Sequence, residues 1–169
     1  MTSDLRIRQY RQEDSERIRQ ITEEGFGPVS TEAAIDRTWP VLPVPWIERK
    51  WRAMQPELQG QPEGCFVAEL DGTVVGYVTT AVVQEYLVGR IPDLAVDSRA
   101  RGQGVGRQLL ECALAYFRSK GLRIARIETL AHNEIGNHLY PQLGFVEVAR
   151  QVHFAMPLED DEKSASRDR

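Results

Sequence analysis

The stretch Arg99-Ala100-Arg101-Gly102-Gln103-Gly104-Val105-Gly106-Arg107 lies between two different sequence patterns. An apolar run over residues 88–96 precedes it, and apolar side chains at helical spacing follow it over residues 105–120. The stretch is therefore a loop between a strand and the N-terminus of a helix, where backbone N–H groups are free to bind an anion. Glycines let the backbone approach a phosphate, and the arginines at 101 and 107 add positive charge. We predict a phosphate-binding loop.

The two commonest nucleotide motifs do not fit this loop. A dinucleotide fingerprint, G-x-G-x-x-G, fails because its last position falls on Arg107 when counted from Gly102, and on Leu109 when counted from Gly104. The G-K-[ST] end of a P-loop is absent. A nucleotide-binding domain is therefore the less favoured interpretation.

The sequence on either side of the loop predicts alternating strands and helices. Asp71-Gly72 is a strong two-residue hairpin turn, and Pro92 favours an irregular strand. A strand, a helix and another strand between about residues 90 and 130 imply a parallel crossover, so the fold class is α/β or α+β. The pattern predicts strands over residues 4–10, 65–70, 73–83, 88–96, 122–131, 145–151 and 153–158, and helices from a cap at Asp14 and over residues 30–39, 46–55, 105–120 and 134–142.

Length and composition indicate one ordinary globular domain. The chain has 169 residues, of which 41% are hydrophobic and 27% are charged. We expect a single domain over residues 1–158 and a disordered polar tail over residues 159–169. The net charge of −4 gives no attraction to nucleic acid or to an anionic membrane, and we expect neither as a partner. The two cysteines are far apart and the three histidines lack metal-ligand spacing, so we expect a cytoplasmic protein with no metal.

Two motifs resemble those of the GNAT (GCN5-related N-acetyltransferase) family. The loop matches the family pattern R/Q-x-x-G-x-G/A from Arg101 to Gly106. Further along, Asn133, Tyr140 and the pair Gly144-Phe145 match N-x6-Y-x3-G-F. Gly136, where the family usually has alanine, and Pro141 depart from this second pattern.

The resemblance implies a mixed, largely antiparallel central sheet flanked by helices, with a splayed strand pair that binds coenzyme A. It also implies that acetyl-CoA is the co-substrate and that Tyr140 is the general acid, because a phenol is protonated at neutral pH. The residues that it assigns to the cofactor are Leu94, Ala95, Val96, Arg101, Gly102, Gln103, Gly104, Val105, Gly106, Arg107, Asn133 and Tyr140.

The general base is less strongly indicated. Glu128 lies twelve residues before Tyr140, a spacing that resembles the ribosomal-protein N-terminal acetyltransferases, where a glutamate acts as the base. The alternative role for Glu128 is a surface ion pair with Arg126, two residues away on the same strand face. Asp93 is a second candidate, and a chain of waters could replace either residue.

The resulting hypothesis is an N-acetyltransferase that moves an acetyl group from acetyl-CoA to a primary amine by direct attack in a ternary complex. The alternative is a non-catalytic acyl-CoA-binding regulatory module. The acceptor is a small-molecule amine or a peptide or protein amine, and the family's dimers leave a homodimer open. The three tryptophans, Trp39, Trp46 and Trp51, cluster around the proline-containing segment 40–45, and their aromatic faces could bind an acceptor or simply pack two helices onto the sheet.

Overall fold

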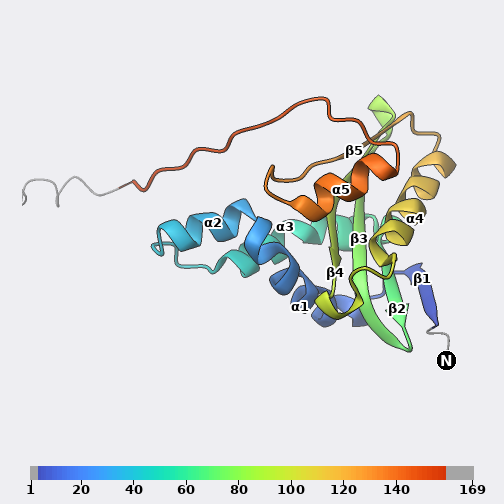
Figure 1. Cartoon of the computed structure of the whole chain (residues 1–169), viewed down its shortest axis with the longest axis horizontal. Coiled ribbons are helices and arrows are strands. Elements are labelled where there is room, and N and C mark those ends of the chain that lie inside the picture. The colour runs from blue at the N-terminus through green and yellow to red at the C-terminus, as the bar shows by residue number, and fades with distance from the viewer. Residues whose placement is uncertain (1–3, 159–169) are drawn as a thin grey trace, which may run out of the picture.

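The sheet has five strands in the order β1-β2-β3-β4-β5 (Figure 1). The computed structural model describes residues 4–158, and the strands are β1 (Leu5–Gln9), β2 (Phe66–Leu70), β3 (Thr73–Val83), β4 (Val88–Val96) and β5 (Ile124–Ile127). The first four pair antiparallel, and β5 pairs parallel to β4. Helix α4 (Val105–Ser119) makes the crossover between those two strands. The predicted fold class, a mixed and largely antiparallel sheet flanked by helices, is confirmed.

Helices cover both faces of the sheet. On one face, α1 (Ser15–Phe26) and α3 (Trp46–Gly60) pack on β3, and α2 (Thr31–Thr38) packs on α3. On the other face lie α4 and α5 (Glu134–Gln142), whose apolar side chains pack with those of β3 and β4. Short 3-10 turns occur at Gln12–Asp14, Gly27–Val29, Pro62–Gly64, Gln84–Tyr86 and Ser98–Ala100.

Local turn chemistry explains the hairpin and the irregular strand. Asp71 and Gly72 have φ values of 49° and 80°, which is the left-handed geometry of a two-residue hairpin turn. Between the β3–β4 pairs Thr79↔Asp93 and Ala81↔Arg90, β3 has one residue and β4 has two. This is a β-bulge that includes Pro92, as the sequence predicts, because proline cannot donate to a ladder.

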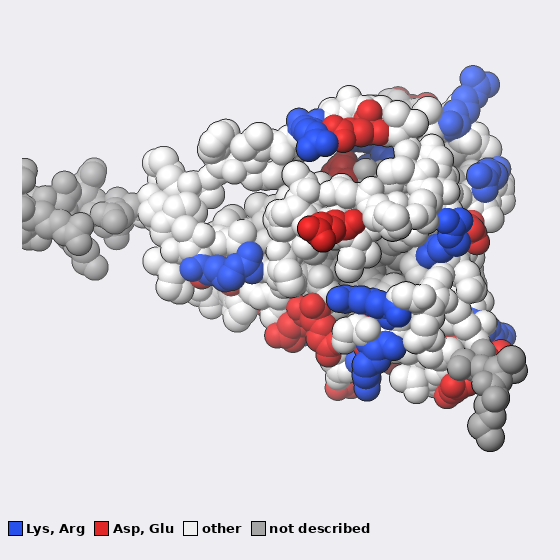
Figure 2. Space-filling view, viewed as in Figure 1, with Lys and Arg blue, Asp and Glu red and all other residues white. Residues whose placement is uncertain are grey.

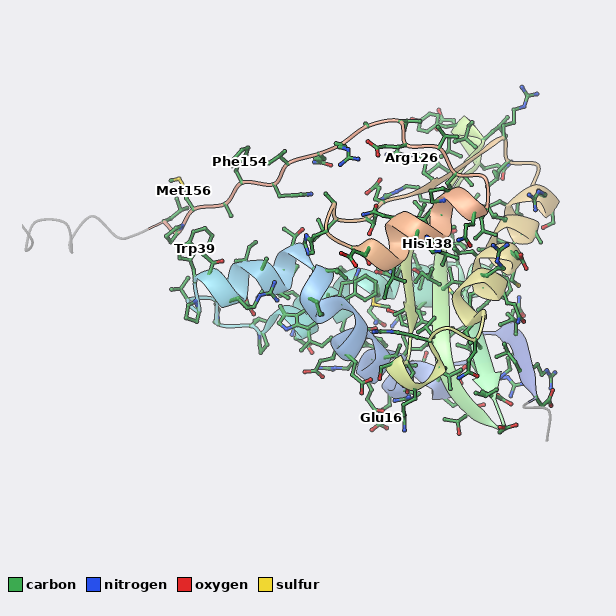
Figure 3. The ribbon with its side chains drawn as sticks, viewed as in Figure 1. Glu16, Trp39, Arg126, His138, Phe154 and Met156 are labelled. Atoms are coloured by element: carbon green, nitrogen blue, oxygen red, sulfur yellow. The ribbon has the colours of Figure 1, made fainter. Side chains whose placement is uncertain are left out.

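The C-terminal end of the described chain differs from the prediction. Residues 145–158 contain no strand, so the predicted strands at 145–151 and 153–158 are wrong. The segment runs as an extended trace away from the helices (Figure 1), and Phe154 and Met156 project from it (Figure 3). Alternation predicts a strand only when a partner edge is present, and here the ladder ends at β5. The exposed apolar side chains of this segment are Val146, Val148, Val152, Phe154, Met156 and Leu158.

Two element boundaries and one helix cap also differ. Strand β5 is shorter than the predicted 122–131, and α3 continues through Pro56 to Gly60 rather than stopping at residue 55. Asp14 precedes α1 as predicted, but its carboxylate makes no capping bond to that helix. It instead pairs with Arg8 at 2.8 Å and accepts a hydrogen bond from the backbone N–H of Arg11. The tail at 159–169 lies outside the described residues.

Candidate functional site

The glycine loop is fixed at its base by a buried carboxylate. Asp97, with 1% of its side chain exposed, accepts a 2.9 Å hydrogen bond from the backbone N–H of Arg99 and forms ion pairs with Arg17 and Arg99. Hydrogen bonds from Arg99 hold the pKa of Asp97 well below its usual range.

Gly102 and Gly104, in the loop itself, have φ values of 75° and 78°, which L side chains rarely adopt. The loop geometry therefore depends on these glycines.

The loop presents free backbone donors at the start of a long helix. Among residues 4–158, no acceptor is recorded for the backbone N–H groups of residues 102–107. The first intrahelical bond at this end runs from Gln108 N to Gly104 O, at 3.1 Å. An α-helix leaves its first N–H groups unpaired and has a positive dipole end there. With Arg101 and Arg107 beside them, these donors suit a phosphate group.

Within the described residues 4–158, the edge of β4 next to the loop lacks a strand partner. The β4–β5 pairing begins at Val88↔Ile124 and ends at Ile91↔Ile127. Beyond that point, residues 94–96 are paired to β3 on one side only. The guanidinium of Arg101 donates to the carbonyl of Val96 at 3.2 Å, which ties the loop to this edge. An extended amide-bearing chain could hydrogen-bond here as an added strand would.

Helix α5 brings Tyr140 to the same place. A Cβ at Gly106 would lie 3.3 Å from Cδ2 of Leu139 and 3.7 Å from Cγ2 of Val96, so α5, α4 and β4 approach closely there. Arg107 also donates to Gln142 on α5 at 3.1 Å. Burial raises the pKa of the Tyr140 hydroxyl to about 12. The structure therefore brings α5, the helix that contains the predicted general acid, next to the predicted cofactor loop.

Two residues of the second motif have structural roles in α5. The side chain of Asn133 accepts from the backbone N–H of Gly136 at 3.3 Å and so caps the helix. A Cβ at Gly136 would lie 3.0 Å from the Tyr140 ring. The glycine at 136, a departure from the family pattern, thus leaves room for that ring, which meets Phe145 edge-on at 6.1 Å. Pro141 lies inside α5 without ending it.

The two candidate bases have different surroundings. Glu128 has 63% of its side chain exposed and pairs with Arg126 at 3.1 Å, so the predicted ion pair is present. It also lies 3.8 Å from Arg90. Asp93 is 2% exposed, pairs with Lys50 and accepts from Thr79 at 3.3 Å. Glu128 is therefore open to solvent, and Asp93 is already neutralised by a lysine.

A cavity of about 290 Å³ lies where β4 and β5 separate. It brings both candidate bases together with side chains that the sequence analysis did not single out, Lys50, Glu57 and Arg90. The sequence contains a signal for Lys50 and Glu57, because their spacing places them on the stripe of α3 that includes the buried Met54. Polar residues on such a stripe indicate a site. The charged lining residues are Lys50, Glu57, Arg90, Asp93, Arg126 and Glu128.

The three tryptophans do not line this cavity. Trp51 packs against the core cluster of α1, α3 and Tyr77. Trp46 begins α3, where its backbone N–H donates to Asp36 at 2.8 Å. Trp39 ends α2, at the far side of the molecule from the sheet (Figure 3). An acceptor role for Trp39 and Trp46 stays a prediction.

Replacing Trp51 by leucine is expected to lower the free energy of unfolding by about 1–3 kcal/mol, because the smaller side chain leaves a void against the core. The same change at Trp39 is expected to have a smaller effect, because that residue lies outside the core clusters. Urea unfolding of the two variants checks this difference. Equal losses would contradict the packing role of Trp51.

The described residues contain neither a group of three metal-binding side chains nor a helix long and apolar enough to cross a bilayer. Acidic and basic side chains alternate over the face in Figure 2, without a uniform basic patch there.

Comparison with known proteins agrees with the loop, the strand edge and the helix. The model of the Acetyltransferase (GNAT) family matches residues 31–145. The chain belongs to this family. The match includes β4, the glycine loop and α5, so it covers the residues on which the resemblance was based.

The matching proteins are named for different acetyl acceptors. Mycothiol acetyltransferase of Cellulomonas flavigena is 35% identical over 115 residues, which are 63% of this chain and 33% of that protein. Human N-acetylaspartate synthetase is 34% identical over 102 residues, 57% of this chain and 32% of that protein. The chain thus spans about a third of these relatives. The structure of aminoglycoside N-acetyltransferase AAC(6')-Iy in complex with CoA matches with a TM-score of 0.67 and 21% identity, over 94% of this chain and 98% of that one.

Proposed function

We propose that this chain is an acetyl-CoA-dependent N-acetyltransferase that acts on a primary amine in a ternary complex. The observation that supports it best is the joint placement of an unpartnered strand edge at residues 94–96 and free N–H groups at residues 102–107. Coenzyme A has a pyrophosphate for the second and pantetheine amides for the first. The named relatives and the CoA complex of a structural neighbour support the same assignment.

The chemistry is an acyl transfer from sulfur to nitrogen. The amine first loses a proton to a base, because an ammonium has no lone pair. The nitrogen then attacks the thioester carbonyl, a C–N bond forms, and the C–S bond breaks as the tetrahedral intermediate collapses. Backbone N–H groups near residues 94–96 would stabilise the oxyanion, and Tyr140 would protonate the leaving thiolate. The net products are an acetamide, coenzyme A thiol and one proton.

The acetyl-CoA part of this proposal is tested by thermal shift and turnover. Saturating acetyl-CoA should raise Tm, and release of free thiol should follow when an amine panel is added. The panel contains amino acids, amino sugars, polyamines and a peptide with a free N-terminus. A Tm shift without turnover on any amine would favour the non-catalytic acyl-CoA-binding module, and no shift would contradict cofactor binding.

Glu128 is our proposed base because it lines the cavity and is exposed to an incoming amine. Replacing it by glutamine keeps the shape and removes the basic oxygen. The acidic limb of the kcat/KM–pH profile should disappear or move, while Glu13→Gln, a change on the exposed surface, should leave it in place. An unchanged limb in Glu128→Gln would transfer the role to Asp93 or to a chain of waters.

The cellular setting stays a prediction. Both cysteines are free thiols in the structure, which fits a reducing compartment such as the cytoplasm. A homodimer likewise stays a prediction.

A further inference from the structure

The cavity where β4 and β5 separate has charges of both signs on different walls. Lys50 and Glu57 come from α3, Arg90 and Asp93 from β4, and Arg126 from β5. Its volume of about 290 Å³ is just below the range for ligand sites, roughly 300–1,000 Å³. A cavity of this size suits a molecule of amino-acid dimensions better than an oligosaccharide.

One wall has an excess of positive charge. Arg90 and Arg126 are register partners on neighbouring parallel strands, so their side chains stand side by side on one face. They share a single carboxylate, Glu128, with N–O distances of 3.8 Å and 3.1 Å. Like charges directly opposite on paired strands repel, and here two cations face one anion. A second carboxylate, supplied by a ligand, would neutralise this wall and could accept bidentate hydrogen bonds from a guanidinium.

The wall formed by α3 has an unsatisfied carboxylate. Atom Oε2 of Glu57 is buried and has no hydrogen-bond partner among the described residues. Burial, and then the nearby charge of Asp93, raise the pKa of Glu57, and the more weakly acting charges of Lys50 and Arg90 lower it without cancelling the rise. Asp93 itself is held by Lys50 and Thr79. A buried polar atom without a partner is costly, and an ammonium or amine N–H would supply the missing donor.

We propose that the cavity binds an acceptor that has a carboxylate close to its amine, such as a free amino acid. Its carboxylate lies between Arg90 and Arg126, and its amine lies between Glu57 and Glu128, the proposed base, both of which line the cavity. This inference rests on the proposed acetyltransferase function, and it names the acceptor class for that site. Pro92 and Asp93 also line the cavity and directly precede residues 94–96, so the amine lies beside the strand edge assigned to the cofactor.

The first test compares matched acceptors. Each of the standard amino acids is assayed beside its α-amide, with acetyl-CoA held at saturation and free thiol as the readout. The acid is expected to have a kcat/KM about 10–100-fold above its amide, the scale of a hydrogen bond to a charged group. Equal values for acid and amide would overturn the inference, as would turnover of polyamines or amino sugars alone.

The second test uses the arginines. Arg90→Gln and Arg126→Gln should each raise the KM of the acid about 10–100-fold and leave the KM of the amide nearly unchanged, so that the preference disappears. Arg123→Gln, an exposed arginine outside the cavity, is the matched control and should keep the preference. A merely structural role for the arginines would raise both KM values together, and that result would contradict carboxylate binding.

These outcomes separate the inference from the proposed function. If acetyl-CoA raises Tm and other amines are acetylated, but no aminocarboxylate is, only the assignment of the acceptor class fails. If no amine is acetylated, the proposed acetyltransferase function fails with it. Glu57→Gln gives a further check, because it should lower kcat/KM for the acid and for the amide alike, since both present the same amine.

Discussion

Replacing Gly104 by aspartate is expected to abolish the thermal stabilisation that acetyl-CoA gives the wild-type protein. A ligand at about one hundred times its Kd stabilises a fold by roughly 2.7 kcal/mol, which corresponds to a Tm rise of about 5–10 °C for a chain of this size. No protein atom lies within 4 Å of a Cβ placed at Gly104, so the new side chain would extend into the space in front of the free N–H groups. Its negative charge would then compete with the phosphate for those donors.

The strain of the substitution itself needs a matched control. Gly104 has a φ of 78°, where a non-glycine residue costs about 1–2 kcal/mol. Gly72 has a φ of 80° and is equally open, but it lies in the β2–β3 hairpin turn. Gly72→Asp should lower Tm by a similar amount and keep the full rise with acetyl-CoA. A Gly104→Asp protein that still shows the wild-type rise would contradict phosphate binding at this loop.

The strands and helices around the glycine loop could be predicted because each depends on residues that are close together in the sequence. Positive φ at a glycine, the bulge at Pro92 and the helical stripe of α4 depend on a few neighbouring residues, and the structure has all three. The Asp71-Gly72 turn is a further example, since its two residues determine the turn and the register of the two adjacent pairs, Leu70↔Thr73 and Glu69↔Val74. The sequence therefore predicted β3, β4 and α5 with their observed boundaries.

The cavity could not be predicted in the same way. Glu57 and Arg126 are 69 positions apart by their numbering, and they line one cavity only because α3 packs on β3 while β5 pairs with β4, the next strand of the sheet. The prediction of two C-terminal strands was wrong for a related reason. The alternation from Val146 to Leu158 specifies which side chains share a face, but a strand also requires an edge to pair with. Both features depend on tertiary contacts that a local pattern does not contain.

Replacing Tyr140 by phenylalanine is expected to lower kcat by about 10²–10⁴-fold while the affinity for acetyl-CoA stays nearly unchanged. The ring packs against Phe145 and the backbone at Gly136, and phenylalanine keeps both contacts. Only the hydroxyl is lost, and burial is the cause of its raised pKa. Tyr116→Phe is the control, because that tyrosine lies on α4 rather than α5 and its hydroxyl donates to Glu63 at 3.4 Å. Wild-type turnover in Tyr140→Phe would mean that the thiolate leaves without a proton from this group.

The pH dependence of wild-type kcat tests the same assignment independently. Burial raises the pKa of Tyr140 to about 12, because removing the phenolate from water costs more than removing the neutral phenol. A general acid works only while it is protonated, so its contribution is lost as pH rises through that pKa and is complete well below it. Deprotonation of Tyr140 should therefore cause no fall in kcat between about pH 8 and 10, although a free tyrosine would begin to ionise there. The contradicting result would be a fall in wild-type kcat with a midpoint below about pH 10 that is absent from Tyr140→Phe. Such a fall would show that the hydroxyl ionises early and does not stay protonated as a general acid.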